Sequence, residues 1–249
     1  APNSAAAQLQ YGYEFSEQRG AAAFLMAVRG WPETPDATPD DVAEMLALRA
    51  RAHTDLRDFS NAEALLDRAE KLSGKPWVHL QRAHLLERQD RVEDALSAAK
   101  SAMALHPHPF HRPAVQTIAY LLQVLDRDPE AIDVLEEAGS VLQSGPVAAQ
   151  LYSLLQENGR WAEASRALER YVELSPLLET GFHKWVASQR ARVAYHLGKR
   201  KEAAVFAVEA GSDFDRRFAE KLNAEGEQGE RVQLDVTFVR QHFKTCAPA

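Results

Sequence analysis

The stretch Gly159-Arg160-Trp161-Ala162-Glu163-Ala164 follows directly on Asn158, so a turn gives way to a helix-favouring run. The alanine that ends this stretch has counterparts at similar intervals along the chain. Ala62 to Ala95 is 33 residues, Ala95 to Ala131 is 36, Ala131 to Ala164 is 33 and Ala164 to Ala203 is 39. A recurring interval of this size indicates an array of one supersecondary unit, repeated along the chain.

Each unit predicts two helices that pack closely on small residues. Twelve positions before each of these alanines, on an expected first helix, stand Ala50, Ala83, Ala119, Tyr152 and Ala191. Four positions after them stand Leu66, Ala99, Leu135, Leu168 and Ala207, and seven after them Ala69, Ala102, Ala138, Tyr171 and Ala210. Positions four and seven apart share one helix face, and helices approach most closely where side chains are small. Turn residues lie between the two helices of each unit, at Asp58, Asp90, Asp126 to Pro129, Asn158-Gly159 and Gly198.

The pattern resembles the tetratricopeptide repeat (TPR), a helix-turn-helix unit of about 34 residues. The stretch 159–164 and Val172-Glu173-Leu174-Ser175-Pro176 carry this resemblance, which covers roughly residues 41–211. It implies an all-α, right-handed solenoid of about five helical hairpins that binds a protein or an extended peptide. We expect capping helices and a proline-rich linker over residues 1–40, repeats over 41–211, a terminal helix over 212–225 and a different segment over 226–249.

Two helix N-caps are expected in the N-terminal part of the chain. Ser4, with Asn3 before it, can cap a helix that includes the apolar run Ala21 to Val28. Thr38 or Asp40 can cap the first repeat helix. The residues before this cap are expected to form a capping hairpin over the apolar end of the array.

Residues 226–249 change character. Val232, Leu234, Val236 and Phe238 alternate with polar residues, which predicts a strand in a short extended tail. The strand, Gln241 and the sequence Cys246-Ala247-Pro248 resemble the N-terminal edge of papain-like cysteine peptidases, with the bacteriocin-processing group and its bacterial relatives most similar. That resemblance implies Cys246 as nucleophile and Gln241 as oxyanion donor of a peptidase domain in a longer polypeptide.

The alternative is an ordinary cysteine in the tail of a stand-alone scaffold or adaptor without enzymatic activity. The two hypotheses differ in the effect of Cys246→Ala on the full-length protein. Loss of activity supports the peptidase, and unchanged activity contradicts it.

The concave face of such an array is formed by its first helices, and it is the expected peptide-binding groove. Counting from the small first-helix residues places there Arg51, Gln81, Gln116, Tyr120, Gln123, Gln150, Ser153, Gln156, Gln189 and Arg192, together with Glu87, Ser188 and Tyr195. Glutamine amides both donate to and accept from a peptide backbone. The alternative is a polar face that is merely solvated.

Composition narrows the remaining classes of function. The net charge of -7 argues against a nucleic-acid partner. The single cysteine excludes an internal disulfide, and the chain has no apolar run long enough for a membrane span, so we expect a soluble, cytoplasmic protein. His106, His108 and His111 lie among prolines in an inter-repeat loop, so neither a metal nor another cofactor is expected. Trp161 and Trp185 are expected to pack in the core. The sequence leaves the oligomeric state open.

Overall fold

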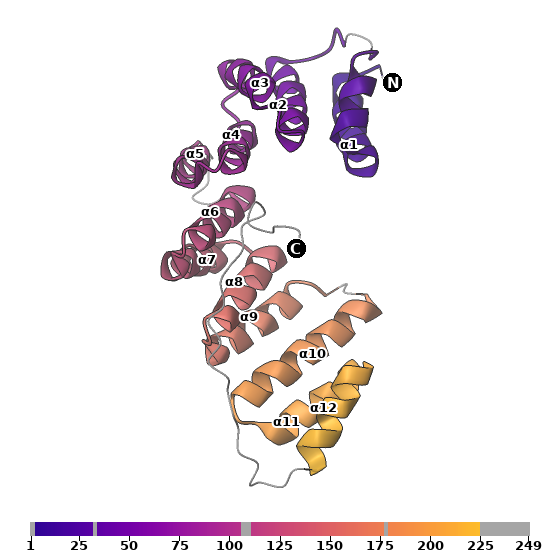
Figure 1. The fold of residues 1–249 in the computed structure, drawn as a ribbon, viewed down its shortest axis with the longest axis vertical. Helices are drawn as coiled ribbons and strands as arrows, with labels where there is room; N and C mark the ends of the chain where they lie inside the picture. Colours follow the sequence, from indigo (N-terminus) through magenta and orange to yellow (C-terminus); the bar gives the residue numbers. More distant parts are fainter. Residues whose placement is uncertain (1–2, 32–33, 106–110, 177–178, 225–249) are drawn as a thin grey trace, which may run out of the picture. The chain divides into compact units, whose positions relative to one another are not determined.

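A computed structural model describes residues 3–31, 34–105, 111–176 and 179–224, and within these ranges the fold is all-α, as predicted (Figure 1). The helices in these ranges are α1 (Ala5–Val28), α2 (Pro39–Asp55), α3 (Phe59–Leu72), α4 (Pro76–Arg88), α5 (Val92–Ala104), α6 (Arg112–Val124), α7 (Asp128–Val141), α8 (Gly145–Glu157), α9 (Trp161–Glu173), α10 (Thr180–His196), α11 (Arg200–Ala210) and α12 (Asp213–Ala224). The predicted strand, extended tail, Gln241 and Cys246 lie outside the described residues.

The chain divides into two compact units, residues 1–127 and residues 128–249. In unit 1, α2 packs against α3 and α4 packs against α5, while α6 contacts both α4 and α5. In unit 2, α8 packs against α9 and α10 against α11, with α7 on α8 and α12 on α11. The predicted helical hairpins are therefore confirmed within each unit (Figure 1). The predicted pair Ala119 and Ala131 is divided between the units, and the handedness of the whole array stays a prediction.

The small residues that define the repeat are core residues. In the first hairpin Ala50, Ala62, Leu66 and Ala69 are all 0% exposed. They belong to one apolar cluster, to which α4 contributes Val78 and Leu85. Because neighbouring hairpins bury one face against the next, the core runs along the repeats of a unit.

Left-handed backbone conformation marks the turn that follows each of the first helices α2, α4, α6, α8 and α10. Asp90, Asp126, Gly159 and Gly198 have φ values of 70°, 56°, 69° and 76°. In the first hairpin Asp58 lies between the two helices, as the sequence suggested, and the left-handed residue is Arg57, with φ of 61°. Asp58 lies one residue on, where its carboxylate accepts hydrogen bonds from Asn61 and faces His53. The left-handed conformation therefore recurs in these turns, while the residue that adopts it differs: Arg, Asp or Gly.

The starts of the first helices follow the expected signals. Thr38 forms a capping box, in which its side chain accepts from the backbone of Asp41 and the Asp41 side chain accepts from the backbone of Thr38. Proline occupies the first turn of α2, α4, α6 and α8. Its fixed φ suits that turn, where the missing N–H has no partner to lose.

The N-terminal helix α1 is interrupted at Gly20, where φ is 81° and ψ is 168°. The chain reverses at this residue, since a Cβ placed on Gly12 would lie only 3.3 Å from the Phe24 ring. Ser4 caps the first arm and accepts from the backbone of Ala7, as expected. Phe24 and the ring of Trp31 then pack against Leu48 of α2, so this segment covers one side of the first hairpin.

The two tryptophans of unit 2 differ in their surroundings. Trp161 is partly buried and stacks on His196, with ring centroids 3.7 Å apart. Trp185 is 40% exposed, so the expectation of a core position was wrong for this residue. Its ring meets Tyr152 and Tyr171 edge-on at 6.3 and 6.1 Å, because these large residues replace small ones in this hairpin.

Candidate functional site

A hollow of about 290 Å³ lies on the face formed by the first helices α2, α4 and α6 of unit 1. We call it the first-helix groove. Four side chains predicted for the peptide-binding face line it: Arg51 of α2, Gln81 and Glu87 of α4, and Tyr120 of α6. The repeat places them together because each lies one, two or four positions from the small first-helix residue. Apolar atoms of Leu80 and Leu121 complete the wall.

An ionic network lies at one side of the groove. The His84 ring presents Nε2 to Asp55 Oδ1 at 3.4 Å and Nδ1 to Glu87 Oε2 at 3.6 Å. Glu87 is only 7% exposed, and its Oε1 accepts a hydrogen bond of 3.3 Å from the Tyr120 hydroxyl. Arg88 Nη2 lies 3.8 Å from the same Asp55 oxygen. The network therefore joins three helices through alternating charges.

The network shifts the titration of its members. Burial lowers the pKa of His84, but the hydrogen bonds to Asp55 and Glu87 outweigh burial, so the pKa is raised overall. The hydrogen bond from His84 is in turn the largest cause of a lowered pKa of Asp55. Burial, reinforced by the charge of Glu87, raises the pKa of the Tyr120 hydroxyl. The two carboxylates thus favour the positively charged form of the imidazole.

We expect the stability conferred by His84 to decrease as the pH rises. Its pKa is higher in the folded chain, so its contribution is complete below the ordinary histidine pKa of about 6.5 and is lost as the pH passes through the raised value. The unfolding free energies of wild type and His84→Gln, measured by urea denaturation at several pH values, should therefore converge on the alkaline side. The exposed His183, changed to Gln, serves as the control. A difference for His84→Gln that does not vary with pH would contradict this role.

Arg51 lies between two hollows. It lines the first-helix groove and also a hollow of about 180 Å³ formed with Tyr13, Gly20 and Asp55. Its side chain is exposed and makes no hydrogen bond or ion pair within the part of the chain that the structure describes. The two hollows extend from the turn of α1, past this guanidinium, to α6. Such a surface fits an extended ligand with an anionic group opposite Arg51.

The other predicted groove residues lie outside this hollow. Gln116 and Gln123 are on α6, partly exposed. Gln150, Ser153 and Gln156 are on α8, and Gln189 and Arg192 are on α10, all in unit 2. Their role in binding stays a prediction.

Unit 2 brings two of these glutamines together at Tyr152. The Tyr152 hydroxyl lies 2.5 Å from Gln156 Oε1 and 2.9 Å from Gln189 Oε1. Since one hydroxyl donates a single hydrogen bond, one amide must present its NH₂ group to the hydroxyl oxygen. Burial raises the pKa of Tyr152 to about 12, although the charge of Arg192 lowers it. The bond with Gln189 joins α8 to α10, while Gln156 lies on α8 with Tyr152. Both amides are engaged, which reduces their freedom to bind a peptide.

Sequence reasoning missed His84 as a groove residue, although the signal was present. His84 follows Ala83 by one position, as Arg51 follows Ala50 and Tyr120 follows Ala119. Its partners Asp55 and Glu87 are 29 residues before it and three after it. The first of these contacts crosses from α2 to α4, so only the packing of the two helices reveals it.

The structure addresses metal binding and membrane spanning only for the residues that it describes. His106 and His108 lie outside them, and His111 is the partly exposed residue just before α6. Across residues 3–31, 34–105, 111–176 and 179–224, no cluster of three metal-ligating side chains is present. No helix in those ranges has the length and hydropathy that crossing a bilayer requires.

Comparison with solved structures identifies the fold as TPR-like. PilF of Pseudomonas aeruginosa superposes with a TM-score of 0.58 at 15% identity, over 87% of this chain and 97% of PilF. YrrB is described as a TPR protein with an unusual peptide-binding site. It superposes with a TM-score of 0.52 at 15% identity, over 74% of this chain and 92% of YrrB. A kinesin light chain of Podospora anserina, described as having nearly identical TPR-like repeats, superposes with a TM-score of 0.52 at 18% identity. The match covers 75% of this chain and 99% of the other.

These identities establish a shared fold and carry no function across. No family model and no curated protein matches the chain. The fold class predicted from the alanine spacing is therefore confirmed by structure, while the resemblance to a cysteine peptidase receives no support from any comparison.

Proposed function

We propose that the chain is a peptide-binding TPR-like scaffold, and that its ligand is an extended peptide lying across α2, α4 and α6. The observation that carries this proposal is the convergence of Arg51, Gln81 and Tyr120 on one hollow. These side chains come from three successive first helices, as a ligand crossing the helices requires. The peptide-binding site named for YrrB belongs to that protein, and it supports the proposal only by showing that a similar fold can bind a peptide.

The groove specifies the chemistry of the ligand. The exposed Pro113, beside the largely buried Leu80 and Leu121, offers an apolar surface for one side chain of the peptide. Gln81 can both donate to and accept from the peptide backbone, and the Thr117 hydroxyl, which donates to the Pro113 carbonyl, can accept from it. Arg51 supplies an exposed guanidinium for an acidic side chain. We therefore infer a preference for peptides in which an acidic residue lies near an apolar one.

Charge reversal at Arg51 is expected to weaken binding at least about tenfold, which corresponds to about 1.4 kcal/mol. Peptides selected from a random library on the purified chain would be labelled and titrated by fluorescence anisotropy against wild type and Arg51→Glu. The expected loss follows from replacing an attractive charge in the groove by a repulsive one.

The matched control is Lys100→Glu, which makes the same change of charge on an exposed site of the second helix α5. We expect it to alter the dissociation constant less than about twofold, since charges beyond a Debye length are screened. Equal losses in both variants would indicate a general effect of net charge and would contradict binding in the first-helix groove.

The place of the scaffold in a longer polypeptide stays a proposal. A cysteine peptidase domain after it rests on the strand pattern, Gln241 and Cys246-Ala247-Pro248, and these residues lie outside the described part of the chain. A stand-alone adaptor is the other proposal. With or without a peptidase domain, the first-helix groove would bind a peptide in an extended conformation. A cytoplasmic location and the absence of a nucleic-acid partner also remain predictions from composition.

A further inference from the structure

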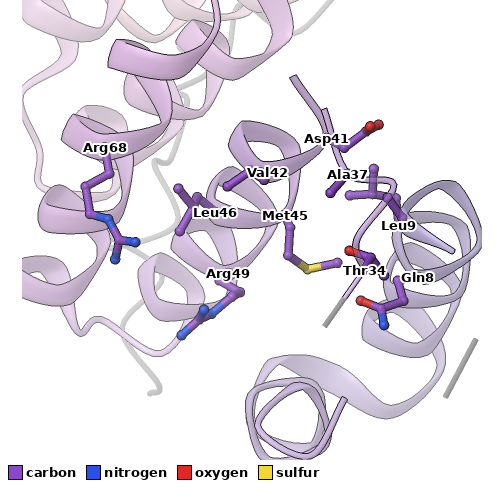
Figure 2. Close-up of a pocket in the computed structure, with 11 residues that line it drawn as sticks. Gln8, Leu9, Thr34, Ala37, Asp41, Val42, Met45, Leu46, Arg49 and Arg68 are labelled. Atoms are coloured by element: carbon purple, nitrogen blue, oxygen red, sulfur yellow. The ribbon is translucent and has the colours of Figure 1, made fainter. Parts of the chain in front are cut away.

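A separate hollow of about 240 Å³ lies between α1, α2 and α3 of unit 1, lined by residues that do not belong to the first-helix groove (Figure 2). Arg49 of α2 and Arg68 of α3 extend to the same end of this hollow in Figure 2. Leu9, Met45 and Leu46 form an apolar wall beside them. We call this hollow the arginine pocket. It joins a cationic end to an apolar surface.

The two arginines are unpaired. Neither makes a hydrogen bond or an ion pair with any residue in the described ranges, and the Nε atom of Arg49 is buried without a partner. Burial lowers the pKa of the Arg49 guanidinium, and the positive charges of Arg68 and then Arg29 lower it further. Two positive charges therefore act on the partly buried Arg49, and no carboxylate among the described residues offsets them there. This arrangement costs stability in the free chain, because buried donors are normally satisfied.

Asp41 also lines the arginine pocket, but it is already engaged. Its carboxylate accepts hydrogen bonds of 2.8 Å from the Thr38 backbone and 2.7 Å from the Thr38 hydroxyl. These bonds lower its pKa and fix it in the capping box of α2. In Figure 2 its side chain is directed away from the two guanidinium groups. Among the described residues that line this hollow, Asp41 is the acidic one, and it does not pair with Arg49 or Arg68.

We propose that the arginine pocket binds an organic phosphate monoester, with the phosphate held by Arg49 and Arg68 and the carbon body lying against Leu9, Met45 and Leu46. Guanidinium groups bind phosphate and carboxylate oxygens in pairs of parallel hydrogen bonds. A phosphate monoester carries a charge close to -2 at neutral pH, and so matches several converging arginines better than a carboxylate does. The site is independent of the peptide proposed for the groove.

Calorimetric titration with phenyl phosphate, benzoate and inorganic phosphate at constant ionic strength tests this proposal on the full chain. We expect phenyl phosphate to bind at least tenfold more tightly than benzoate, because of its charge, and more tightly than inorganic phosphate, because its ring covers the apolar wall. Arg49→Met and Arg68→Met should each weaken phenyl phosphate at least tenfold. Arg217→Met removes an exposed arginine of α12 and should leave binding unchanged.

Thermal unfolding gives a second readout that does not depend on the heat of binding. Phenyl phosphate should raise the melting temperature of wild type and of Arg217→Met, but not that of Arg49→Met. Arg49→Met without ligand should melt no lower than wild type, since it removes a partly buried charge whose Nε atom has no partner, so misfolding would be recognised. Equal effects of phenyl phosphate on all variants, or no binding, would overturn the site. Tighter binding of benzoate would overturn the assignment to phosphate.

Discussion

Leu66→Ala should lower the free energy of unfolding by about 2–5 kcal/mol. Leu66 is 0% exposed on α3 and belongs to the cluster that joins the first hairpin to α4 through Val78 and Leu85. Truncation removes apolar area from the core and leaves a cavity that the surrounding helices fill only partly. Urea denaturation followed by circular dichroism measures the change. The effect is large because one side chain supports two neighbouring repeats.

Leu72→Ala is the matched control for this prediction. Leu72 lies on the same helix but is 43% exposed, so its truncation should cost about 1 kcal/mol or less. A similar cost for the two variants would mean that the burial pattern of α3 is different from the one described. In that case the repeat frame that begins at Ala62 would be wrong.

Ala62→Leu is expected to destabilise the chain by about 1–3 kcal/mol, although it adds apolar surface. Ala62 is 0% exposed at the close contact of α3 with α2, where Ala50 is also 0% exposed. A larger side chain forces the two helices apart or into strained rotamers, because interiors are close-packed. Urea denaturation followed by circular dichroism measures this loss of unfolding free energy. The result tests directly whether small residues are needed where the two helices of a hairpin meet.

Ala64→Leu provides the comparison. It introduces the same side chain two residues along α3, at an exposed position. Leucine and alanine are both good helix formers, so the change should stay within about 0.5 kcal/mol. If Ala62→Leu were equally harmless, close packing of small residues would not be what holds the hairpin together.

The fold could be predicted from the sequence because its cause is local and repeated. Ala62, Ala95, Ala164 and Ala203 are each 0% exposed, as the spacing required. Helix starts were also predictable, since Ser4 and Thr38 cap as their residue types favour. The exception at Arg57 is instructive. A left-handed turn there follows from the shared geometry of the hairpins and could not be predicted from the residue type.

The candidate sites could be predicted only in part. Counting along the first helices brought Arg51, Gln81 and Tyr120 to one face, because that face follows from helix periodicity alone. The arginine pocket was not predicted at all. Arg49 and Arg68 lie on different helices, and α1 contributes Gln8 and Leu9 to the hollow only because it packs against α2. Long-range charge relations of this kind are set by packing, which leaves no periodic signal in the sequence.

The central claim is that a peptide binds in the first-helix groove, and chemical-shift mapping tests it most directly. Backbone amide spectra would be recorded while a library-selected peptide is added to the labelled chain. We predict the largest shifts around Arg51 in α2, Gln81 and His84 in α4, and Thr117 and Tyr120 in α6. Shifts concentrated on the second helices α3 and α5, with these positions unchanged, would contradict the proposed function.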